Sequence, residues 1–302
     1  RIFITGGAGF IGIHLCKKLL ELNHDITVYD NFSNSSKDNF ESIIKQKITL
    51  ISGDILDQSK LDASMKDHDV VIHLAAQISV SESIKNPKLT FEINVNGTQN
   101  VLNACLKNNI TKIIATSTAA VYQNTSTKTI LDETSPVKPL SPYGKSKLEM
   151  ENKIITFCSV HNITYSILRL FNVYGIGQSL EYAGVITKFH EKIQNNSPLI
   201  IFGDGTAVRD FVHVDDVINA IILSIQYSNS FTCNIASGTS TSISDLAKTM
   251  IALSHKDLKI LNKPPRIGEI MFSAADITLA KKNLGFIPKI SLKSGLEQFM
   301  SN

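Results

Sequence analysis

Short runs of β-branched and other apolar residues alternate with helix-length amphipathic stretches over the first 170 residues. The runs lie at residues 2–5, 26–29, 48–52, 70–74, 112–116 and 164–170, and the amphipathic stretches predict helices at 9–22, 87–108 and 143–161. Apolar strands separated by helices are typical of a parallel sheet that helices cover on both faces. The pattern therefore predicts an α/β fold with a doubly wound parallel sheet.

The alternation weakens after residue 170, where glycine and proline interrupt shorter elements. We therefore expect residues 1–170 to form the domain with the doubly wound sheet and residues 171–302 to form a smaller α/β lobe. Part of 207–236 is expected to return to the first domain. Two stretches rich in Asn, Ser and Lys, at 31–39 and 123–129, predict surface loops.

Three glycines follow the first predicted strand with the spacing TGxxGxxG. Gly6 suits a tight turn, Gly9 lets the backbone approach a pyrophosphate, and Gly12 allows close packing of helix on strand. The helix begins at Phe10 and Ile11, where free N–H groups and the positive end of the helix dipole favour an anion. The motif lies between a strand and a helix, which predicts a dinucleotide site. The alternative is a glycine-rich turn without a ligand.

A carboxylate ends the second predicted strand, 18 residues after Gly12. Asp30 is placed to accept hydrogen bonds from an adenosine ribose and would repel a 2′-phosphate, which favours NAD over NADP. The alternative is an aspartate that starts a turn before Asn31. Asp54, followed by Ile55, comes after the third strand and is placed for the adenine, although alone it would be an ordinary turn residue.

A tyrosine and a lysine stand four residues apart at the start of the helix at 143–161. Positions i and i+4 share one face of a helix, so Tyr143 and Lys147 point in the same direction. A free phenol has a pKa of about 10; an ammonium group and the positive nicotinamide of NAD both favour the phenolate, which can act as a base. Alone, the spacing is common on surfaces, but after the glycine motif it predicts a catalytic pair.

A threonine follows the fifth predicted strand, at the edge where open α/β sheets bind ligands. Thr118 can supply the hydroxyl that hydrogen-bonds the reacting oxygen beside the phenol. The alternative is a half-buried threonine at a strand end. The position therefore predicts a third member of the catalytic group.

Composition and charge narrow the function. The chain has 43% apolar residues and a formal net charge of +3 without a run of like charges, so we expect no nucleic-acid partner. No apolar run reaches the roughly 18 residues of a membrane span, so we expect no membrane association. The separated Cys16, Cys105, Cys158 and Cys233 favour reduced thiols in a cytoplasm, and the histidines lack metal-ligand spacing, which predicts no metal site. The chain opens on a strand rather than a signal peptide, although its start at Arg1 leaves a short leader open.

Ten motifs in order along nearly the whole chain carry a family resemblance. They are TGGAGFIG at 5–12, YDNFS at 29–33, GDI at 53–55, HLAAQ at 73–77, NVNGT at 94–98, TSTAAVY at 116–122, YGKSK at 143–147, RLFNVYG at 169–175, FGDGTAVRDFVHVDD at 202–216 and RIGEIMFSAAD at 266–276. The chain resembles the extended short-chain dehydrogenases that modify nucleotide sugars, and most of all their UDP-hexose 4-epimerases. The resemblance also implies a homodimer, to which the helices at 87–108 and 143–161 would contribute.

The resemblance implies a Rossmann-type fold, bound NAD and a UDP-sugar substrate held by the lobe at 171–302. It implies that Thr118, Tyr143 and Lys147 are catalytic, and that Lys147 also contacts the nicotinamide ribose. The further residues implied for the cofactor site are Leu74, Ala75, Ala76, Asn94 and Thr116. Those implied for the substrate are Asn172, Arg209 and Arg266 at the diphosphate, Glu269 at the ribose, Ile200 and Phe202 at the uracil, and Ser79 and Ser273 near the sugar. Helix capping is the alternative for Ser79.

Two alanines after Thr118 select among the reactions of this family. Dehydratases need an Asp–Glu pair where this chain has Ala119 and Ala120, and decarboxylases need a Glu at the second place, because a methyl group cannot transfer a proton. One base and one hydride acceptor suit epimerisation at C4 through a transient 4-keto sugar. A keto-sugar reductase or dehydrogenase and a non-catalytic NAD(H) sensor are the alternatives. Ser273 replaces a bulky tyrosine of some epimerases, which favours entry of UDP-GlcNAc and UDP-GalNAc besides UDP-Glc and UDP-Gal.

Overall fold

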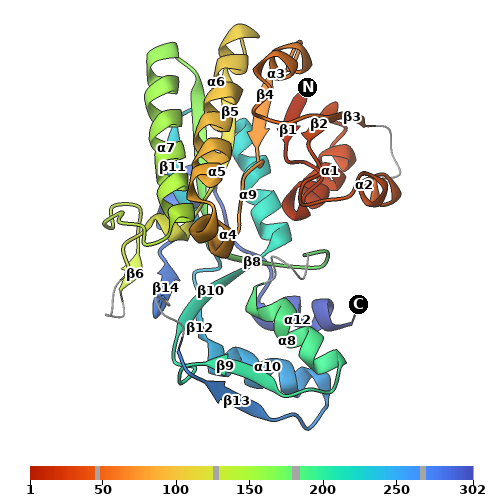
Figure 1. The fold of residues 1–302 in the computed structure, drawn as a ribbon, viewed down its shortest axis with the longest axis vertical. Helices are drawn as coiled ribbons and strands as arrows, with labels where there is room; N and C mark the ends of the chain where they lie inside the picture. The colour runs from red at the N-terminus through yellow and green to blue at the C-terminus, as the bar shows by residue number, and fades with distance from the viewer. Residues whose placement is uncertain (45–47, 125–128, 179–183, 266–269, 302) are drawn as a thin grey trace. The chain divides into compact units, whose positions relative to one another are not determined.

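The chain forms two compact units, each assembled from three segments (Figure 1). The computed structural model describes residues 1–44, 48–124, 129–178, 184–265 and 270–301. Unit 1 consists of Arg1–Val121, Ser141–Arg169 and Ile218–Cys233, and unit 2 of Tyr122–Leu140, Leu170–Val217 and Asn234–Asn302. The chain therefore leaves unit 1 and re-enters it twice.

Unit 1 is built on a seven-stranded sheet. Its strands are β1 (Ile2–Thr5), β2 (Ile26–Asp30), β3 (Thr49–Ser52), β4 (Val70–His73), β5 (Lys112–Thr118), β7 (Thr164–Leu170) and β11 (Phe231–Ile235), in the order β11-β7-β5-β4-β1-β2-β3. β1 pairs in parallel with both β2 and β4, so the strand order reverses between β1 and β4. Open α/β sheets bind ligands at the carboxyl ends of the strands beside such a reversal. The predicted doubly wound sheet is confirmed, and β11 adds a strand that the pattern does not predict.

The helices of unit 1 include three that the sequence pattern does not predict. α1 (Phe10–Glu21) and α7 (Pro142–His161) agree with predicted helices, whereas α2 (Lys37–Ile43), α3 (Gln58–Ser64) and α4 (Val80–Lys85) are additional. The loop expected at 31–39 is wrong at its end, because the Ser36 hydroxyl accepts a hydrogen bond from the Asn39 amide (3.3 Å) and starts α2. Residues 125–128 of the other expected loop lie outside the described residues.

The helix expected at 87–108 is three consecutive elements: α5 (Pro87–Phe91), the π-helix η1 (Glu92–Gly97) and α6 (Thr98–Lys107). A π-helical turn holds one extra residue and is frequent at functional sites. Asn94 and Thr98 are both buried, and the Thr98 hydroxyl donates to the Asn94 carbonyl (2.7 Å). The extra residue therefore brings two polar side chains to the inner side of this long helix.

Alternate residues of the strands build the core of unit 1. One face of the sheet packs against α3, α6 and α7 through Phe3, Tyr29, Val71, Ile113 and Ile167 together with Leu61, Leu102, Met150 and Ile154. The residues between them, such as Ile4, Val28, Ile72 and Ile114, are fully buried as well. Helices therefore cover the sheet on both faces, which explains why its strands are continuously apolar.

Unit 2 contains two smaller sheets and its own core. In one sheet β12 (Ser240–Ser242), β10 (Val208–His213), β14 (Phe272–Ala275) and β6 (Ile130–Leu131) follow each other, and β8 (Asn172–Tyr174) pairs with β10. The other sheet joins β9 (Leu199–Phe202) to β13 (Ile260–Lys263). α8 (Val185–Gln194), α10 (Ile243–Ser254) and α12 (Leu292–Met300) share a core with β9 and β10. Two further helices are α9 (Val214–Gln226), whose sequence passes from unit 2 into unit 1, and α11 (Thr278–Leu284).

The described part of the chain contains neither a candidate membrane span nor a candidate metal site. None of its helices combines the length and the apolarity that crossing a membrane requires. Within the same residues, no three His, Cys, Asp or Glu side chains are grouped so that they could hold a metal ion.

Candidate functional site

The glycine motif forms a tight turn between β1 and α1. Gly6 has a φ of +70°, and a Cβ there would lie 2.5 to 2.9 Å from backbone atoms of Leu74 and Ala75. A Cβ at Gly12 would overlap the carbonyl group of Gly7. At Gly9 a Cβ would meet only the Gly6 oxygen, at 3.3 Å, and α1 starts without a side-chain cap. The turn therefore needs glycine at its first and third positions and presents the uncapped, partly exposed start of α1, with Phe10 and Ile11.

Asp30 at the end of β2 is tied to this turn. Its Oδ2 accepts a hydrogen bond from the Ala8 amide (2.9 Å), and its Oδ1 accepts one from the Phe32 amide (2.8 Å). The contact to Phe32 is the turn role that the sequence left open for Asp30, and the contact to Ala8 joins the carboxylate to the glycine turn. Oδ1 also accepts from the Ser35 hydroxyl (3.3 Å), but Oδ2 can accept a further bond, so both roles are compatible.

Asp54 and Asn31 form a second polar group beside the sheet. The Asn31 side-chain amide donates to Asp54 Oδ2 (2.8 Å), and Asp54 Oδ1 accepts from the Leu56 amide (2.9 Å). Ile55 is buried, 5% exposed, against Gly97 of η1. The two loops that follow β2 and β3 are therefore fixed to each other, on the strands next to the glycine turn.

His73 connects β4 to β1 and α6 through a buried hydrogen-bond chain. Its Nδ1 is 2.7 Å from the Thr5 hydroxyl and its Nε2 is 2.9 Å from the Thr98 hydroxyl. The single Thr98 proton goes to the Asn94 carbonyl, so His73 Nε2–H donates to Thr98 and Nδ1 accepts from Thr5. Burial, with a smaller effect of the Lys147 charge, lowers the pKa of His73 to about 3, so the ring is neutral. It holds the start of the partly exposed loop formed by Leu74, Ala75 and Ala76.

Asn94, expected at the cofactor, holds this loop to α7. It is 1% exposed; its Oδ1 accepts from the Gln77 amide (2.8 Å), and its Nδ2 donates to the Gln77 carbonyl (3.0 Å) and to the Ser146 hydroxyl (2.9 Å). Ser146 in turn donates to the Tyr143 carbonyl (2.8 Å). The side chain of Asn94 thus fixes the backbone around the site, and the sequence reasoning missed Gln77 and Ser146 because both contacts depend on the π-helical turn.

The structure brings Thr118 and Tyr143 together. Ser141 caps α7 by accepting from the Gly144 amide (3.0 Å), which sets Tyr143 in the first turn of the helix. Thr118 ends β5, and both β5 and η2 contact α7. Burial raises the pKa of Tyr143, and the nearby hydroxyl of Thr118 acts in the opposite direction. In the protein alone the phenol therefore stays protonated at neutral pH.

Lys147 lies one turn further along α7 and is 4% exposed. Burial lowers its pKa to about 8, against the charge of Glu151, which raises it. Its Nζ lies 3.1 Å from Met150 Sδ. Lys147 is therefore a buried ammonium group near its titration range, close to the phenol along the helix.

The alanines after Thr118 form the short 3₁₀ helix η2 (Ala119–Val121). The Ala120 amide donates to Thr118 Oγ1 (3.1 Å), and Thr116 lies partly exposed on β5. Ala119 and Ala120 thus sit directly beside the hydroxyl of Thr118 without an ionisable group.

Three of the expected substrate residues of unit 2, Asn172, Arg209 and Ser273, lie on adjoining strands. Arg209 on β10 stands opposite Ser273 on β14, and Asn172 on β8 stands opposite Phe211 of β10. The Arg209 guanidinium donates to the Val208 carbonyl (2.8 Å). Ile200 and Phe202 belong to β9, and Arg266 and Glu269 lie outside the described residues.

Ser79 caps a helix, which is the alternative role that the sequence left open for it. It is the N-cap of α4, where its hydroxyl accepts from the Glu82 amide (3.2 Å). A contact of Ser79 with the sugar stays a prediction.

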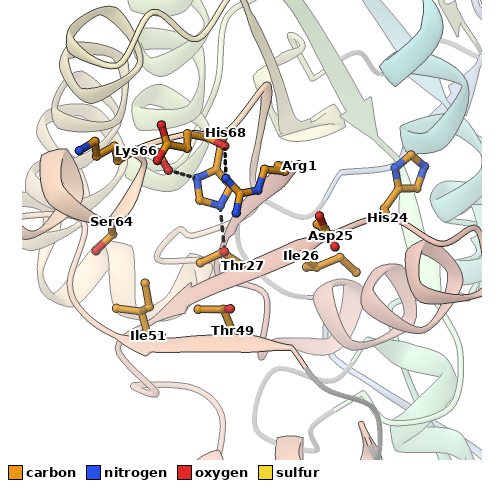
Figure 2. Close-up of a pocket in the computed structure, with 11 residues that line it drawn as sticks. Arg1, His24, Asp25, Ile26, Thr27, Thr49, Ile51, Ser64, Lys66 and His68 are labelled. Carbon is orange, nitrogen blue, oxygen red and sulfur yellow. Dashed lines mark hydrogen bonds between the residues drawn. The ribbon is translucent and has the colours of Figure 1, made fainter.

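A pocket of about 440 Å³ lies in unit 1 (Figure 2). It is lined by Ile26, Thr27 and Thr49, at or near the amino ends of β2 and β3, and by His68, whose Nε2 is 2.8 Å from the Thr27 hydroxyl. β2 runs from Ile26 to Asp30, about 13 Å at the usual rise of a strand. The pocket therefore lies at the opposite edge of the sheet from the glycine turn and does not belong to the candidate site.

Comparison with known proteins identifies the family of the chain. Residues 2–236 match the model of the NAD dependent epimerase/dehydratase family. A putative UDP-glucose 4-epimerase of Methanocaldococcus jannaschii is 40% identical over 305 residues, which cover 99% of this chain and 97% of that protein. The crystal structure of a UDP-glucose 4-epimerase from Thermotoga maritima with UDP-glucose has a TM-score of 0.94 and 34% identity, covering 99% of this chain and 97% of that one. A UDP-N-acetylglucosamine 4-epimerase from Methanobrevibacter ruminantium with UDP-N-acetylmuramic acid has a TM-score of 0.94 and 32% identity, covering 100% and 97%. The chain belongs to the NAD dependent epimerase/dehydratase family.

Proposed function

We propose that the chain is an NAD-dependent 4-epimerase of UDP-hexoses, which works through a transient 4-keto sugar. The observation that carries the proposal is the position of Thr118 at the end of β5, which contacts α7, the helix that holds Tyr143 in its first turn and the buried Lys147 one turn further along. Two alanines follow Thr118. The family of the chain and the names of its relatives support the same reaction.

The residues around β1 fit NAD. Gly6 and Gly12 exclude a Cβ, while Gly9 and the uncapped start of α1 leave backbone N–H groups for a pyrophosphate. The other residues proposed to contact the cofactor are Phe10, Ile11, Asp30, Asn31, Asp54, Ile55, Leu74, Ala75, Ala76, Asn94, Thr116, Tyr143 and Lys147. Bound NAD supplies the acceptor, and then the donor, of the hydride at C4.

Tyr143 is proposed as the group that takes the C4 hydroxyl proton and returns it. Burial raises the pKa of its phenol, so the phenolate requires positive charge nearby, and the Lys147 ammonium is one source. The Thr118 hydroxyl can donate to the phenolate or to the sugar oxygen. Ala119 and Ala120 offer no second acid or base, so neither of these two positions could remove a C5 proton. This separates the proposed reaction from dehydration.

The residues of unit 2 are proposed to hold the nucleotide part of the substrate. Arg209, Arg266 and Asn172 would contact the diphosphate, Glu269 the ribose, and Ile200 and Phe202 the uracil. A guanidinium presents a planar pair of donors to phosphate oxygens, which is why arginine suits this position. Tight binding of the nucleotide leaves the hexose free to turn and to accept hydride on its other face.

The proposed reaction is tested by following anomeric proton signals by NMR after the protein is mixed with UDP-galactose. Conversion to UDP-glucose without a net change in nicotinamide absorbance supports epimerisation. A stoichiometric absorbance change supports instead a keto-sugar reductase or dehydrogenase. A protein that binds NAD but converts no UDP-sugar supports the non-catalytic sensor.

The substituent at C2 of the sugar is proposed to be either hydroxyl or N-acetyl. Ser273 is small, and its partner across the sheet is Arg209. A small residue leaves space that a bulky side chain would fill, and this supports entry of an N-acetyl group. The same NMR experiment with UDP-N-acetylgalactosamine checks this, and no conversion of that sugar limits the range to UDP-glucose and UDP-galactose.

Replacement of Arg209 with alanine is expected to weaken substrate binding more than turnover. A hydrogen bond to a charged group contributes about 1.5 to 3 kcal/mol, so KM for UDP-galactose should rise about 10- to 100-fold while kcat changes much less. Steady-state kinetics and the affinity for UDP measured by calorimetry check this. Arg209→Lys, which keeps a positive charge, should lose less, and an unchanged UDP affinity in Arg209→Ala would remove Arg209 from the diphosphate site.

A homodimer and a cytoplasmic location are also proposed. Leu89 on α5, Leu106 on α6 and Val160 on α7 are 48%, 42% and 69% exposed, and such apolar side chains suit an interface. Sedimentation velocity is expected to give twice the mass of the chain, and replacement of Val160 with glutamate is expected to favour the monomer. A wild-type monomer would contradict the dimer. All four cysteines are buried and none of them forms a disulfide, which supports a reducing compartment.

A further inference from the structure

A buried ion pair joins α7 to β7 close to Lys147. Glu151 is 1% exposed and Arg169 is 8% exposed. Arg169 Nη2 lies 2.7 Å from Glu151 Oε2, and Arg169 Nε lies 3.1 Å from Glu151 Oε1. Two donors of one guanidinium thus hold both oxygens of the carboxylate, the strongest geometry for such a pair.

Glu151 also acts on Lys147. The two residues are four positions apart on α7, so their side chains share one face of the helix. Lys147 is buried, which disfavours the ammonium form, and the charge of Glu151 favours it. The carboxylate therefore interacts with two cations: Lys147 on its own helix and Arg169 on β7.

Few other charges face Lys147. His73 on β4 is neutral at physiological pH, as its lowered pKa shows, and Tyr143 is protonated in the protein alone. The other charged side chains of the elements that pack against α7 are exposed or have other partners. Lys88 and Glu92 are exposed. Glu82 pairs with Lys85, Lys107 pairs with Asp62, and Lys112 donates to the Tyr227 carbonyl. Glu151 is thus the one acidic group placed to favour the charged form of Lys147 among the described residues of these elements.

We infer that Glu151 is a positioning residue for the proposed reaction: it keeps the Lys147 side chain in its ammonium form, and Arg169 fixes the carboxylate in the place where it does so. The inference rests on the proposed function, in which Lys147 contacts the nicotinamide ribose and favours the phenolate of Tyr143. Glu151 and Arg169 act through Lys147 and contact neither the sugar nor the cofactor.

Both members of the pair should shift the titration of Lys147 in the same direction. The ammonium form is present below its pKa and is lost as the pH rises through about 8. Glu151→Gln removes an attracting charge and leaves the charge of Arg169, so the loss should occur about 1 pH unit lower. Arg169→Gln no longer holds the carboxylate in place, so the loss should also occur at lower pH, by less than in Glu151→Gln.

The test measures NAD affinity by equilibrium dialysis, and kcat with UDP-galactose, across the pH range in which Lys147 loses its charge. Both quantities should fall on the alkaline side, with a lower midpoint in Glu151→Gln and a smaller decrease of the midpoint in Arg169→Gln. Glu151→Asp keeps the charge and should restore most of the shift. Glu149→Gln is the matched control, because Glu149 is an exposed carboxylate on the same helix, and its midpoint should equal that of the wild type.

A buried Arg169 without its partner could prevent folding of Glu151→Gln. The double variant Glu151→Gln with Arg169→Gln removes both charges, and its midpoint should then lie below that of the wild type by less than 1 unit. Coincident midpoints in the wild type and in every folded variant that lacks Glu151 overturn the inference and leave the pair a purely structural contact.

Failure of the proposed function has a different signature. If the wild type converts no UDP-sugar, the proposed function fails, while a shifted midpoint of NAD affinity still supports the effect of Glu151 on Lys147. If the wild type is an epimerase and neither midpoint moves, the inference alone fails.

Discussion

Replacement of Tyr143 with phenylalanine is expected to lower kcat for UDP-galactose by about 10²- to 10⁴-fold, the usual contribution of a positioned acid or base. The aromatic ring remains and only the phenol hydroxyl is lost, so the fold should persist. KM for UDP-galactose should change little, because the proposed contacts with the nucleotide belong to unit 2. Steady-state kinetics together with thermal unfolding measure both effects.

Two controls make the Tyr143 experiment decisive. Tyr165→Phe removes a phenol from a half-buried tyrosine on β7, and kcat should stay close to that of the wild type. The 4-keto sugar route also predicts that Tyr143→Phe still binds NAD. An unchanged kcat in Tyr143→Phe would falsify the assignment of Tyr143 as the base, whereas loss of NAD binding would show that the phenol acts mainly through its proposed contact with the cofactor.

Replacement of Gly12 with alanine is expected to damage cofactor binding and stability together. The new methyl group would overlap the carbonyl group of Gly7, whose neighbouring strands leave no space for the turn to retreat. Overpacking of this kind costs about 1 to 3 kcal/mol, so NAD affinity should fall by about 5- to 150-fold if the displaced turn carries the loss. Equilibrium dialysis with NAD and chemical denaturation measure the two effects.

The control for Gly12 is a glycine in open space. A Cβ at Gly184, before α8, meets no atom within 4 Å, so Gly184→Ala should leave NAD affinity unchanged. If Gly12→Ala binds NAD as the wild type does, the glycine turn does not hold the pyrophosphate, and the proposed cofactor site is wrong.

The sequence predicts the sheet and the polar groups that chain order places at its edge. The central strands of unit 1 are buried on both faces, so their residues are continuously apolar and easy to locate. Gly6 follows such a strand, Asp30 and Thr118 end such strands, and parallel strands bring their carboxyl ends to one edge. For this reason periodicity and spacing predict the neighbours of the candidate site.

The features that the sequence does not predict depend on contacts between distant segments or on short helices. α2, α3 and α4 have at most seven residues, too few for a helical period to be visible. The π-helical turn that directs Asn94 to Gln77 and Ser146 has no pattern of its own. Glu151 and Arg169 are typical surface residues in composition, and only the packing of α7 on β7 makes them a buried pair.

The sequence reasoning named the Lys147 ammonium and the positive nicotinamide as the charges that favour the Tyr143 phenolate, but it did not include the burial of the phenol. Burial raises the pKa of Tyr143 in the protein without its cofactor. Since Thr118 only opposes this effect, a base at neutral pH depends on both positive charges. The enzyme would therefore gain its base on binding oxidised NAD and lose it as the sugar is oxidised.

Asp30 shows how cofactor preference and local folding are combined in this chain. The carboxylate that would distinguish NAD from NADP is also the acceptor for the Ala8 amide inside the glycine turn (2.9 Å). An evolutionary change towards NADP would have to replace Asp30 and would release that amide at the same moment. Selectivity for the adenosine ribose and the shape of the pyrophosphate turn thus depend on the same side chain. This makes the NAD preference hard to reverse by one substitution.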